Sequence, residues 1–361
     1  MTGFTRRQFL EASAAALFRP SRSEPRRVVL PEFARTFQEA LVCLPGPVEA
    51  EPFFEVAFRD LLSAVPSYTT LHVVARREPR DLANRESVRF HLVEDPAVEI
   101  DLWAQDMGEP VFLEGRERFL VAKRMSAAMG PPGKMSSDRR WIAELVVGEG
   151  AVREAPFVFE GGNLAFDTDR ILVGYNVVSR TVATYDALGA RVSRARVLDD
   201  IRAEFGGMEV IEMGTESQTP LLQHIDQAFV ILDGGVAVAC RVRDRGLEAE
   251  SRQLQRYASQ LRELGYEVSF LDHGASDLER SRSSVNVVPF VDRSTGKKRV
   301  LVPIFPGELQ EEAKVVDRAA LIGKAARAFD LYRDLGYEPT PLRDVTHALG
   351  GNTHCIVNVL S

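Results

Sequence analysis

Five polar residues recur along this chain at intervals of roughly sixty residues, and each stands at the head of an apolar segment or just before one. The intervals are 54, 66, 60 and 69 residues, and the five are Asp106, Glu160, Asp226, Asn286 and Cys355. Such internal repetition predicts an α/β fold built from repeated strand–strand–helix units. Units that each bring one polar residue to a common place favour a closed ring, because strand ends converge on the axis of a ring. An ordinary α/β sheet with incidental polar residues at its strand ends is the alternative.

The segments between these residues show strand and helix patterns. Apolar runs separated by turn residues such as Asp-Gly-Gly and Ser-Thr-Gly predict hairpins over 88–106, 157–175, 224–242 and 285–305, and a last buried strand over 353–360. Apolar residues at helical spacing predict helices over 51–65, 194–206, 250–264 and 311–335. The last two helices should stop at the glycines that follow them, Gly265 and Gly336.

Composition argues against some classes of function. The 361 residues carry a net charge of −7, whereas proteins that bind nucleic acid without sequence preference need a cationic surface. Three cysteines, Cys43, Cys240 and Cys355, are too few and too scattered for a disulfide framework. No C-x-x-C or H-x-x-x-H spacing indicates zinc, so we expect no metal site.

Residues 1–25 have the features of an export signal. Residues 5–10 match the Ser/Thr-Arg-Arg-x-Phe-Leu pattern of twin-arginine signals, and the apolar run ASAAALF follows. That run is shorter than the ~20 apolar residues that span a bilayer. We therefore expect the twin-arginine translocase to deliver residues 26–361, as a single domain, to the periplasm or the outside of a bacterial cell. The alternative is a basic, disordered tail.

Two of the repeated units offer groups that act on protons or cations. His224 and Asp226 are two residues apart at the predicted start of a strand, so both side chains should point to the same face. Histidine can transfer a proton near neutral pH. Asp106 follows Trp103, and a carboxylate that a tryptophan partly desolvates favours a cationic partner.

Cys355 is the candidate nucleophile. On a strand, Thr353 and Cys355 would face one way and His354 the other, so we expect the base for the thiol to be His224 rather than its neighbour. A thiol becomes a useful nucleophile where a neighbouring cation or base favours the thiolate. The glycine pair just before this segment would let the backbone approach closely.

Two carboxylates, a histidine and a thiol together indicate chemistry on a guanidinium group. Two carboxylates that face each other repel unless a positive group with several donors lies between them. A guanidinium has five N–H donors in a planar fork and pairs with carboxylates bidentately. A cysteine aimed at its central carbon would complete a deiminase.

The chain resembles the guanidino-modifying enzymes of the pentein superfamily, whose fold is a five-bladed α/β propeller, and within it the branch of protein-arginine and agmatine deiminases. The motifs that carry the resemblance are WAQD with Asp106, FEGGN with Glu160, HID with His224 and Asp226, SSVN with Asn286, and GGNTHC with Cys355. The resemblance implies a catalytic set of Cys355, His224, Asp106 and Asp226. It also implies that the substrate-binding residues are Trp103, Gln105, Glu160, Asn163, Asn286 and Gly351.

The resemblance also implies a reaction that needs no cofactor. Asp106 and Asp226 would hold and polarise the guanidinium while the Cys355 thiolate attacks its central carbon. His224 would protonate the departing ammonia, and a covalent amidino-thioether would form. His224 would then activate a water that releases a ureido product. Two easier steps in place of one hard step are the usual benefit of covalent catalysis.

The motifs point to two kinds of substrate. Gln105 and the ending HCIVNV are similar to protein-arginine deiminases, whereas FEGGN and the compact length are similar to agmatine deiminases. The Gln105 amide would suit a substrate backbone carbonyl. We expect arginine within a peptide as the main substrate, with agmatine or another small guanidino compound as the alternative. An amidinotransferase and an inactive guanidino-binding protein are further alternatives.

Overall fold

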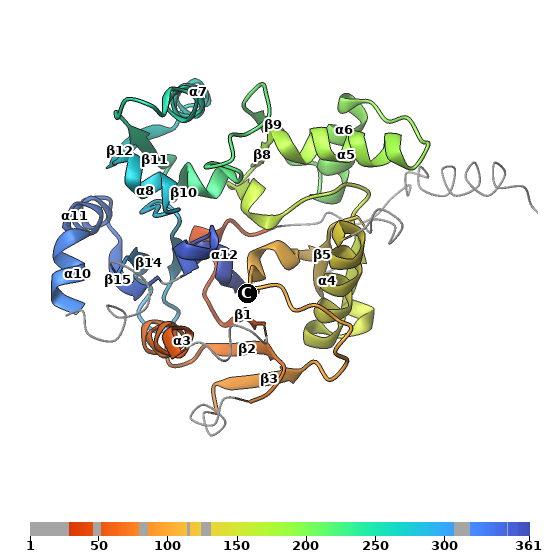
Figure 1. The fold of residues 1–361 in the computed structure, drawn as a ribbon, viewed down its shortest axis with the longest axis horizontal. Helices are drawn as coiled ribbons and strands as arrows, with labels where there is room; N and C mark the ends of the chain where they lie inside the picture. Colours follow the sequence, from red (N-terminus) through yellow and green to blue (C-terminus); the bar gives the residue numbers. More distant parts are fainter. Residues whose placement is uncertain are drawn as a thin grey trace, which may run out of the picture.

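The computed structural model describes residues 29–45, 52–78, 86–113, 116–123, 131–306, 318–344 and 346–361. The strands in these ranges form five small sheets that stand around a common centre, with most of the helices on the outside of the ring (Figure 1). The fold is therefore an α/β ring of five small sheets, in agreement with the predicted fold class.

Four of the sheets share one plan. In each, the first strand is antiparallel to the second and the second is parallel to the third. In chain order, their strands are β4 (Glu109–Leu113), β5 (Arg116–Val121) and β6 (Val152–Glu154); β7 (Leu164–Phe166), β8 (Arg170–Gly174) and β9 (Glu209–Met213); β10 (Phe229–Leu232), β11 (Val236–Val242) and β12 (Glu267–His273); and β13 (Val288–Val291), β14 (Lys298–Ile304) and β15 (Glu338–Arg343).

The fifth sheet closes the ring by joining the two ends of the chain. Its order is β16 (Asn358–Val359), β1 (Glu39–Leu44), β2 (Thr70–Ala75) and β3 (Val88–Leu92). Strand β16 is antiparallel to β1, with Ala40 opposite Val359, and β1 is parallel to β2. The first three strands therefore repeat the plan of the other four sheets, although they come from opposite ends of the sequence. Closure of this kind leaves fewer exposed strand edges.

Helices connect the strands. They are α3 (Pro52–Ala64), α4 (Pro131–Val147), α5 (Tyr175–Ala187), α6 (Arg194–Glu204), α7 (Glu248–Glu263), α8 (Ala275–Glu279), α10 (Arg318–Lys324), α11 (Ala326–Asp334) and α12 (Thr353–Ile356). Short 3-10 turns are η1 (Glu32–Ala34), η2 (Ala104–Met107), η4 (Glu149–Ala151), η5 (Gly161–Asn163), η6 (Ile225–Gln227) and η7 (Thr346–Leu349). None of the helices within the described ranges is long and apolar enough to cross a membrane.

Three predicted elements differ from the structure. Residues 88–106 are not a hairpin: β3 pairs in parallel with β2, and the acidic, proline-containing stretch after it is a loop, so the hairpin is β4–β5. Residues 353–360 are not one strand, because Asn286 Oδ1 accepts the backbone N–H of His354 inside the turn α12. The predicted helix over 311–335 is α10 and α11 over its described part, and α4 and α5 had not been predicted.

Candidate active site

Four short helical turns meet at the centre of the ring. They are η2, η5, η6 and α12, and each one shortly precedes the first strand of a sheet. Because the sheets are arranged around one axis, the turns that enter them come together although they lie far apart in the sequence (Figure 1). This placement brings Asp106, Glu160, Asp226 and Cys355 to one place, as the repeat predicted.

A cavity of about 350 Å³ opens where these turns meet. Its charged and reactive lining residues are Asp106, Arg139, Glu160, His224 and Cys355. The volume lies within the usual range for sites that bind small molecules. The combination of a thiol, an imidazole and carboxylates in one wall makes it the candidate active site.

The thiol of Cys355 is buried among polar groups. Its Sγ lies 3.6 Å from Oδ2 of Asp226 and 3.5 Å from the amide nitrogen of Asn286. Burial raises the pKa of Cys355 well above its ordinary value, and the charge of Asp226 raises it further. The free protein therefore holds a neutral thiol, and a cation near Sγ would favour the thiolate.

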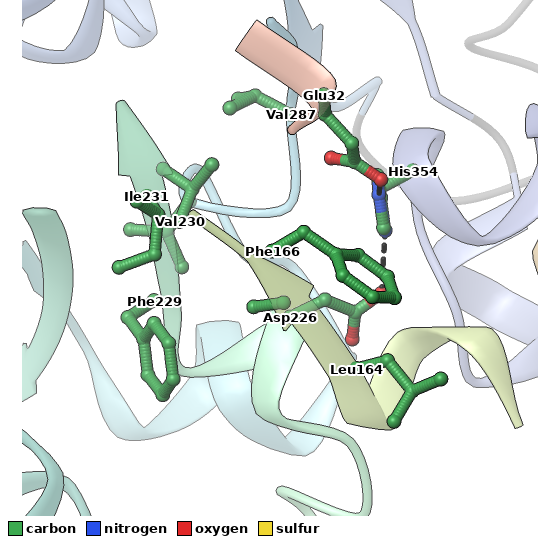
Figure 2. A pocket seen from close by; sticks show the side chains of 11 residues that line it. Glu32, Leu164, Phe166, Asp226, Phe229, Val230, Ile231, Val287 and His354 are labelled. Atoms are coloured by element: carbon green, nitrogen blue, oxygen red, sulfur yellow. Dashed lines mark hydrogen bonds and ion pairs between the residues drawn. The ribbon is translucent and has the colours of Figure 1, made fainter. Parts of the chain in front are cut away.

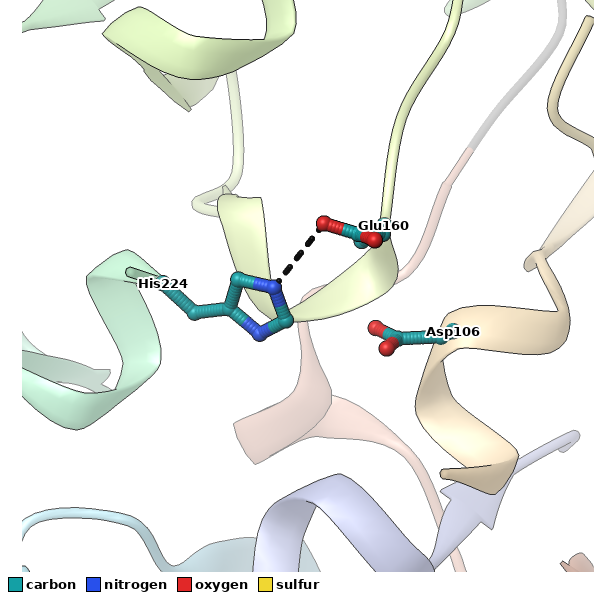
Figure 3. A group of neighbouring side chains, drawn as sticks. All are labelled: Asp106, Glu160 and His224. Carbon is teal, nitrogen blue, oxygen red and sulfur yellow. Dashed lines mark hydrogen bonds and ion pairs between the residues drawn. The ribbon is translucent and has the colours of Figure 1, made fainter. Parts of the chain in front are cut away.

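The imidazole of His224 faces two carboxylates (Figure 3). Its Nε2 is 3.1 Å from Oε2 of Glu160, which also pairs with the guanidinium of Arg180. Burial opposes the charging of His224, but the carboxylates of Asp106 and Glu160 outweigh it and raise its pKa to about 9. At neutral pH His224 is therefore an imidazolium that can donate a proton.

The guanidinium of Arg139 lies beside the carboxylate of Asp106. Arg139 on α4 donates through Nε to Asp101 at 3.1 Å, and its Nη2 lies 3.7 Å from Oδ2 of Asp106. Burial raises the pKa of Asp106 to about 6, although His224 and Arg139 oppose that rise. Near neutral pH the carboxylate is therefore ionised and can bind a cation.

Asp106, Glu160 and His224 also lie close enough to one another, within 4.8 Å, to be considered as metal ligands. A metal binds the neutral imidazole. His224 has a pKa of about 9 and its Nε2 is bonded to Glu160, so the group as arranged is an acid with its carboxylate partner. The two carboxylates of this group, Asp106 and Glu160, can also accept hydrogen bonds from a planar cation with several N–H groups.

The family comparison decides the assignment. The family model of Porphyromonas-type peptidyl-arginine deiminases matches residues 49–358. The chain belongs to this family. It is therefore a hydrolase that acts on amidine C–N bonds, in agreement with the guanidino chemistry inferred from the motifs.

Solved structures of other deiminases share the fold of this one. Agmatine deiminase of C. jejuni is 14% identical, with a TM-score of 0.64 and coverage of 92% of this chain and 95% of the other. A Cys-to-Ser variant of agmatine deiminase from C. jejuni with substrate bound is 15% identical, with a TM-score of 0.67 and the same coverage. A Porphyromonas gingivalis protein described as an arginine deiminase is 19% identical, with a TM-score of 0.66 and coverage of 92% and 97%. A comparison with curated protein sequences found no significant match.

Several residues predicted to bind substrate do line the cavity of this deiminase. Trp103, Glu160 and Gly351 belong to its wall. Gly351 packs so closely on the ring of Trp103 that any side chain at this position would collide with it. In the FEGGN motif, a Cβ on Gly162 would lie 2.7 Å from Nδ1 of His224 and 2.8 Å from Oδ2 of Asp226. The glycines of these motifs therefore let the backbone approach Trp103, His224 and Asp226 closely.

The other predicted substrate contacts are buried behind the wall. Gln105 donates through Nε2 to Glu109 at 3.0 Å, so the structure does not place its amide at the cavity. Asn163 accepts from Gln218 at 2.9 Å and donates to the carbonyl of Gln223, the residue before His224. Asn286, described above, contacts the thiol. These three amides bond to groups of the protein itself, and none of them belongs to the cavity wall.

His354 is a residue of the site that the sequence argument set aside. It was expected to point away from Cys355 on a strand, but it lies on a helical turn. Its Nδ1 is 2.8 Å from Oδ2 of Asp226. It is not placed as a base for the thiol, because its ring is bonded to carboxylates. No local sequence pattern indicates this contact, since Asp226 and His354 are 128 residues apart.

Proposed function

We propose that this deiminase converts arginine within peptides to citrulline and ammonia through a covalent intermediate on Cys355. The observation that carries the proposal is the position of the Cys355 thiol in a cavity whose other reactive groups are His224, Asp106 and Glu160, with Asp226 3.6 Å from the sulfur. A guanidinium held by Asp106 and Asp226 would have its central carbon next to that sulfur.

The first half of the reaction follows from the charges. When the substrate cation enters, it offsets the negative charge of Asp226 and Asp106, and the Cys355 thiol releases its proton to solvent because His224 is already protonated. The thiolate attacks the guanidinium carbon and forms the C–S bond. The His224 imidazolium gives its proton to the departing nitrogen, the C–N bond breaks and ammonia leaves. An amidino-thioether remains on Cys355.

In the second half of the reaction, His224 acts as a base instead of an acid. His224, now neutral, takes a proton from water, and the hydroxide attacks the amidino carbon. The C–S bond breaks and Cys355 leaves as the thiolate. The product loses its extra proton to ammonia, so a ureido group and ammonium are released. Glu160 keeps the imidazole oriented in both halves through its 3.1 Å contact.

The lining of the cavity favours a neutral group at the far end of the substrate. Agmatine carries an ammonium there, which would need a carboxylate. The carboxylates among the described lining residues are Asp106 and Glu160, and both lie at the guanidinium end. Apart from Arg139 and His224, the other lining side chains are neutral. They belong to Trp103, Pro220, Leu221, Gln223, Gln227, Ser281, Leu349 and Cys355. Peptide groups suit such a wall, whereas an ammonium at the far end would have no carboxylate of the described lining beside it.

An assay of ureido product and ammonia from a blocked peptidyl-arginine, free arginine and agmatine, side by side, tests the proposal. We expect the highest kcat/KM for the peptide. Fastest turnover of agmatine would assign the enzyme to agmatine, which the fold similarity to agmatine deiminases keeps as the second candidate. Binding of all three without turnover would leave a guanidino-binding protein.

We also infer that the enzyme is exported by the twin-arginine translocase and acts on peptides in the periplasm or outside the cell. Residues 1–25 lie outside the described ranges, so the proposal rests on the Arg6–Arg7 pattern. Val29, the first described residue, is buried in a core cluster with Val111 and Leu120. A leader that ends before this residue would leave the ring intact.

A further inference from the structure

The imidazole of His354 lies between the carboxylates of Asp226 and Glu32, and all three residues line a small pocket (Figure 2). Its Nδ1 is 2.8 Å from Oδ2 of Asp226, and its Nε2 is 2.7 Å from Oε1 of Glu32. An ionised carboxylate can only accept hydrogen bonds. Both ring nitrogens therefore donate, and His354 is an imidazolium held between two anions. One of these anions, Asp226, forms with Asp106 the pair of carboxylates proposed to hold the guanidinium, here called the guanidinium clamp. The other anion, Glu32, lies near the start of the described chain.

Glu32 lies on a segment that its neighbouring residues hold in place. The turn η1 packs against β13, and Phe33 is buried in the core. Arg35 donates from Nη1 to the carbonyl of Val359 at 2.9 Å and from Nη2 to Glu109 at 3.4 Å. The position of Glu32 is therefore set by its neighbours, so the loss of its charge should leave the segment in place.

The charged groups around His354 come from several elements. Glu32 lies on η1, Asp226 on η6 and Glu109 on β4, while Arg35 pairs with Glu109. Burial opposes the charging of His354, but Glu32 and Asp226 outweigh it and hold the pKa of the imidazole well above its ordinary value. The imidazolium is thus a lasting counter-ion for Asp226.

His354 contacts both Asp226, a carboxylate of the proposed clamp, and Asn286, which lies beside the thiol. Its ring fixes Oδ2 of Asp226, while the other oxygen, Oδ1, is buried and has no hydrogen-bond partner among the described residues. Its backbone N–H donates to Oδ1 of Asn286 at 2.8 Å, and the amide nitrogen of Asn286 lies 3.5 Å from Sγ of Cys355. The orientation of His354 therefore sets the positions of the clamp carboxylate and of the group beside the thiol.

We propose that Glu32 is a positioning residue of this deiminase. Acting through His354, it keeps the carboxylate of Asp226 oriented to receive the guanidinium, although neither Glu32 nor His354 belongs to the wall of the substrate cavity. This inference rests on the proposed function, because Asp226 matters to it as part of the guanidinium clamp.

Glu32→Gln tests the proposal, with Glu39→Gln as the matched control. Glu39→Gln removes the same charge from the same part of the chain, but the carboxylate that it removes lies beside His72 rather than His354. We expect kcat/KM of Glu32→Gln to fall about 10- to 100-fold, the effect of losing one hydrogen bond to a charged group. Glu32→Asp should recover part of the activity, and the thermal midpoints of all three variants should stay near that of the wild type. An unchanged kcat/KM in Glu32→Gln would overturn the proposal.

The protonation of His354 gives a readout that does not require turnover. In ¹⁵N-labelled protein, the signal that disappears in His354→Gln identifies this imidazole. We expect it to stay doubly protonated to a higher pH in the wild type and in Glu39→Gln than in Glu32→Gln, because the Glu32 carboxylate raises the pKa of the imidazole. A neutral His354 at neutral pH in the wild type would contradict the proposal.

A binding measurement separates this proposal from the proposed function. If the wild type turned over no guanidino substrate, the proposed function would fail, and the affinity for methylguanidinium would decide the role of Glu32. Affinity about tenfold weaker in Glu32→Gln than in Glu39→Gln would support it. Equal affinity in the two variants, or no binding to the wild type, would refute it.

Discussion

The thiol of Cys355 lies 3.6 Å from the carboxylate of Asp226, so the proposed nucleophile is next to an anion rather than to a base. Its other polar neighbour is the amide of Asn286 at 3.5 Å, whereas the imidazole of His224 is bonded to Glu160. This arrangement disfavours the thiolate in the free enzyme and favours it once a guanidinium has bound. Such an enzyme would be protected from unwanted thiol reactions until its substrate arrives.

Replacing Cys355 by Ala or Ser should abolish turnover while substrate still binds, because the thiol forms the covalent bond and the aspartates make the ground-state contacts. Losses on the order of 10⁴-fold or more are typical when a nucleophile is removed from a catalytic unit. Steady-state kinetics and calorimetric binding would measure the two effects. Cys240→Ala is the matched control, since this buried thiol lies beside His273 and outside the cavity, and it should only perturb packing. Activity near the wild-type level in Cys355→Ala would end the deiminase assignment.

Asp226→Asn should change turnover and thiol reactivity in opposite directions. Turnover should fall about 10- to 100-fold, because a charge-assisted contact to the guanidinium becomes a neutral one. The negative charge of Asp226 raises the pKa of Cys355, so its removal should shift alkylation of Cys355 by iodoacetamide to lower pH. Mass spectrometry of the labelled peptide would follow this reaction.

Asp106→Asn is the comparison for Asp226→Asn. The charge of Asp106 contributes less than that of Asp226 to the raised pKa of Cys355. This variant should lose turnover to a similar extent but speed alkylation less. Slower alkylation of Cys355 in Asp226→Asn than in the wild type would contradict the assigned electrostatics.

Glu160→Gln should move the alkaline limb of the pH–rate profile to lower pH. His224 must carry a proton to protonate ammonia, and its pKa of about 9 keeps it charged at neutral pH. Without the Glu160 carboxylate its folded-state pKa falls, so the acid is lost at a lower pH. We expect a shift of about one pH unit, equivalent to ~1.4 kcal/mol, in kcat measured between about pH 6 and about pH 10. Glu212→Gln, which removes a carboxylate paired with Arg194, should leave the limb in place.

Gln105→Ala should slow peptidyl-arginine and agmatine to the same degree. The sequence suggested that its amide contacts a peptide carbonyl, but the amide is bonded to Glu109. Its loss would therefore act through the η2 turn that carries Asp106, at a cost of about 0.5–1.5 kcal/mol in the barrier for any guanidino substrate. Competition between the two substrates measures the ratio of their kcat/KM values directly. A loss confined to the peptide would restore the predicted substrate contact.

Changing Arg6 and Arg7 together to lysine should keep the protein in the cytoplasm of a bacterial host. The pair is an address read by a receptor, so lysines that retain the charge should not replace it. Fractionation of cells expressing each form would show where the protein is. Normal translocation of the double-lysine form would mean that residues 1–25 have another role.

Local sequence patterns were sufficient to predict many of the helices and hairpins of the fold. The helical spacing around Leu254, Tyr257 and Leu261 predicts α7, and turn residues between apolar runs predict the hairpins β7–β8, β10–β11 and β13–β14. These elements depend on residues within about twenty positions of one another, so a short stretch of sequence is enough to predict them. The hairpin expected over 88–106 was wrong because apolar content alone does not distinguish a parallel edge strand and loop from a hairpin.

The repeat in the sequence is enough to identify Asp106, Glu160, Asp226 and Cys355 as the candidate reactive groups. How these groups are charged and oriented depends on the folded ring. Glu32 lies 322 residues from His354, and His354 lies 128 residues from Asp226, so no local pattern relates them. The ring closes by pairing β1 with β16, and this closure places the N-terminal turn beneath the active site. A pKa depends on burial and on distances between charges, and these exist only once the ring has closed.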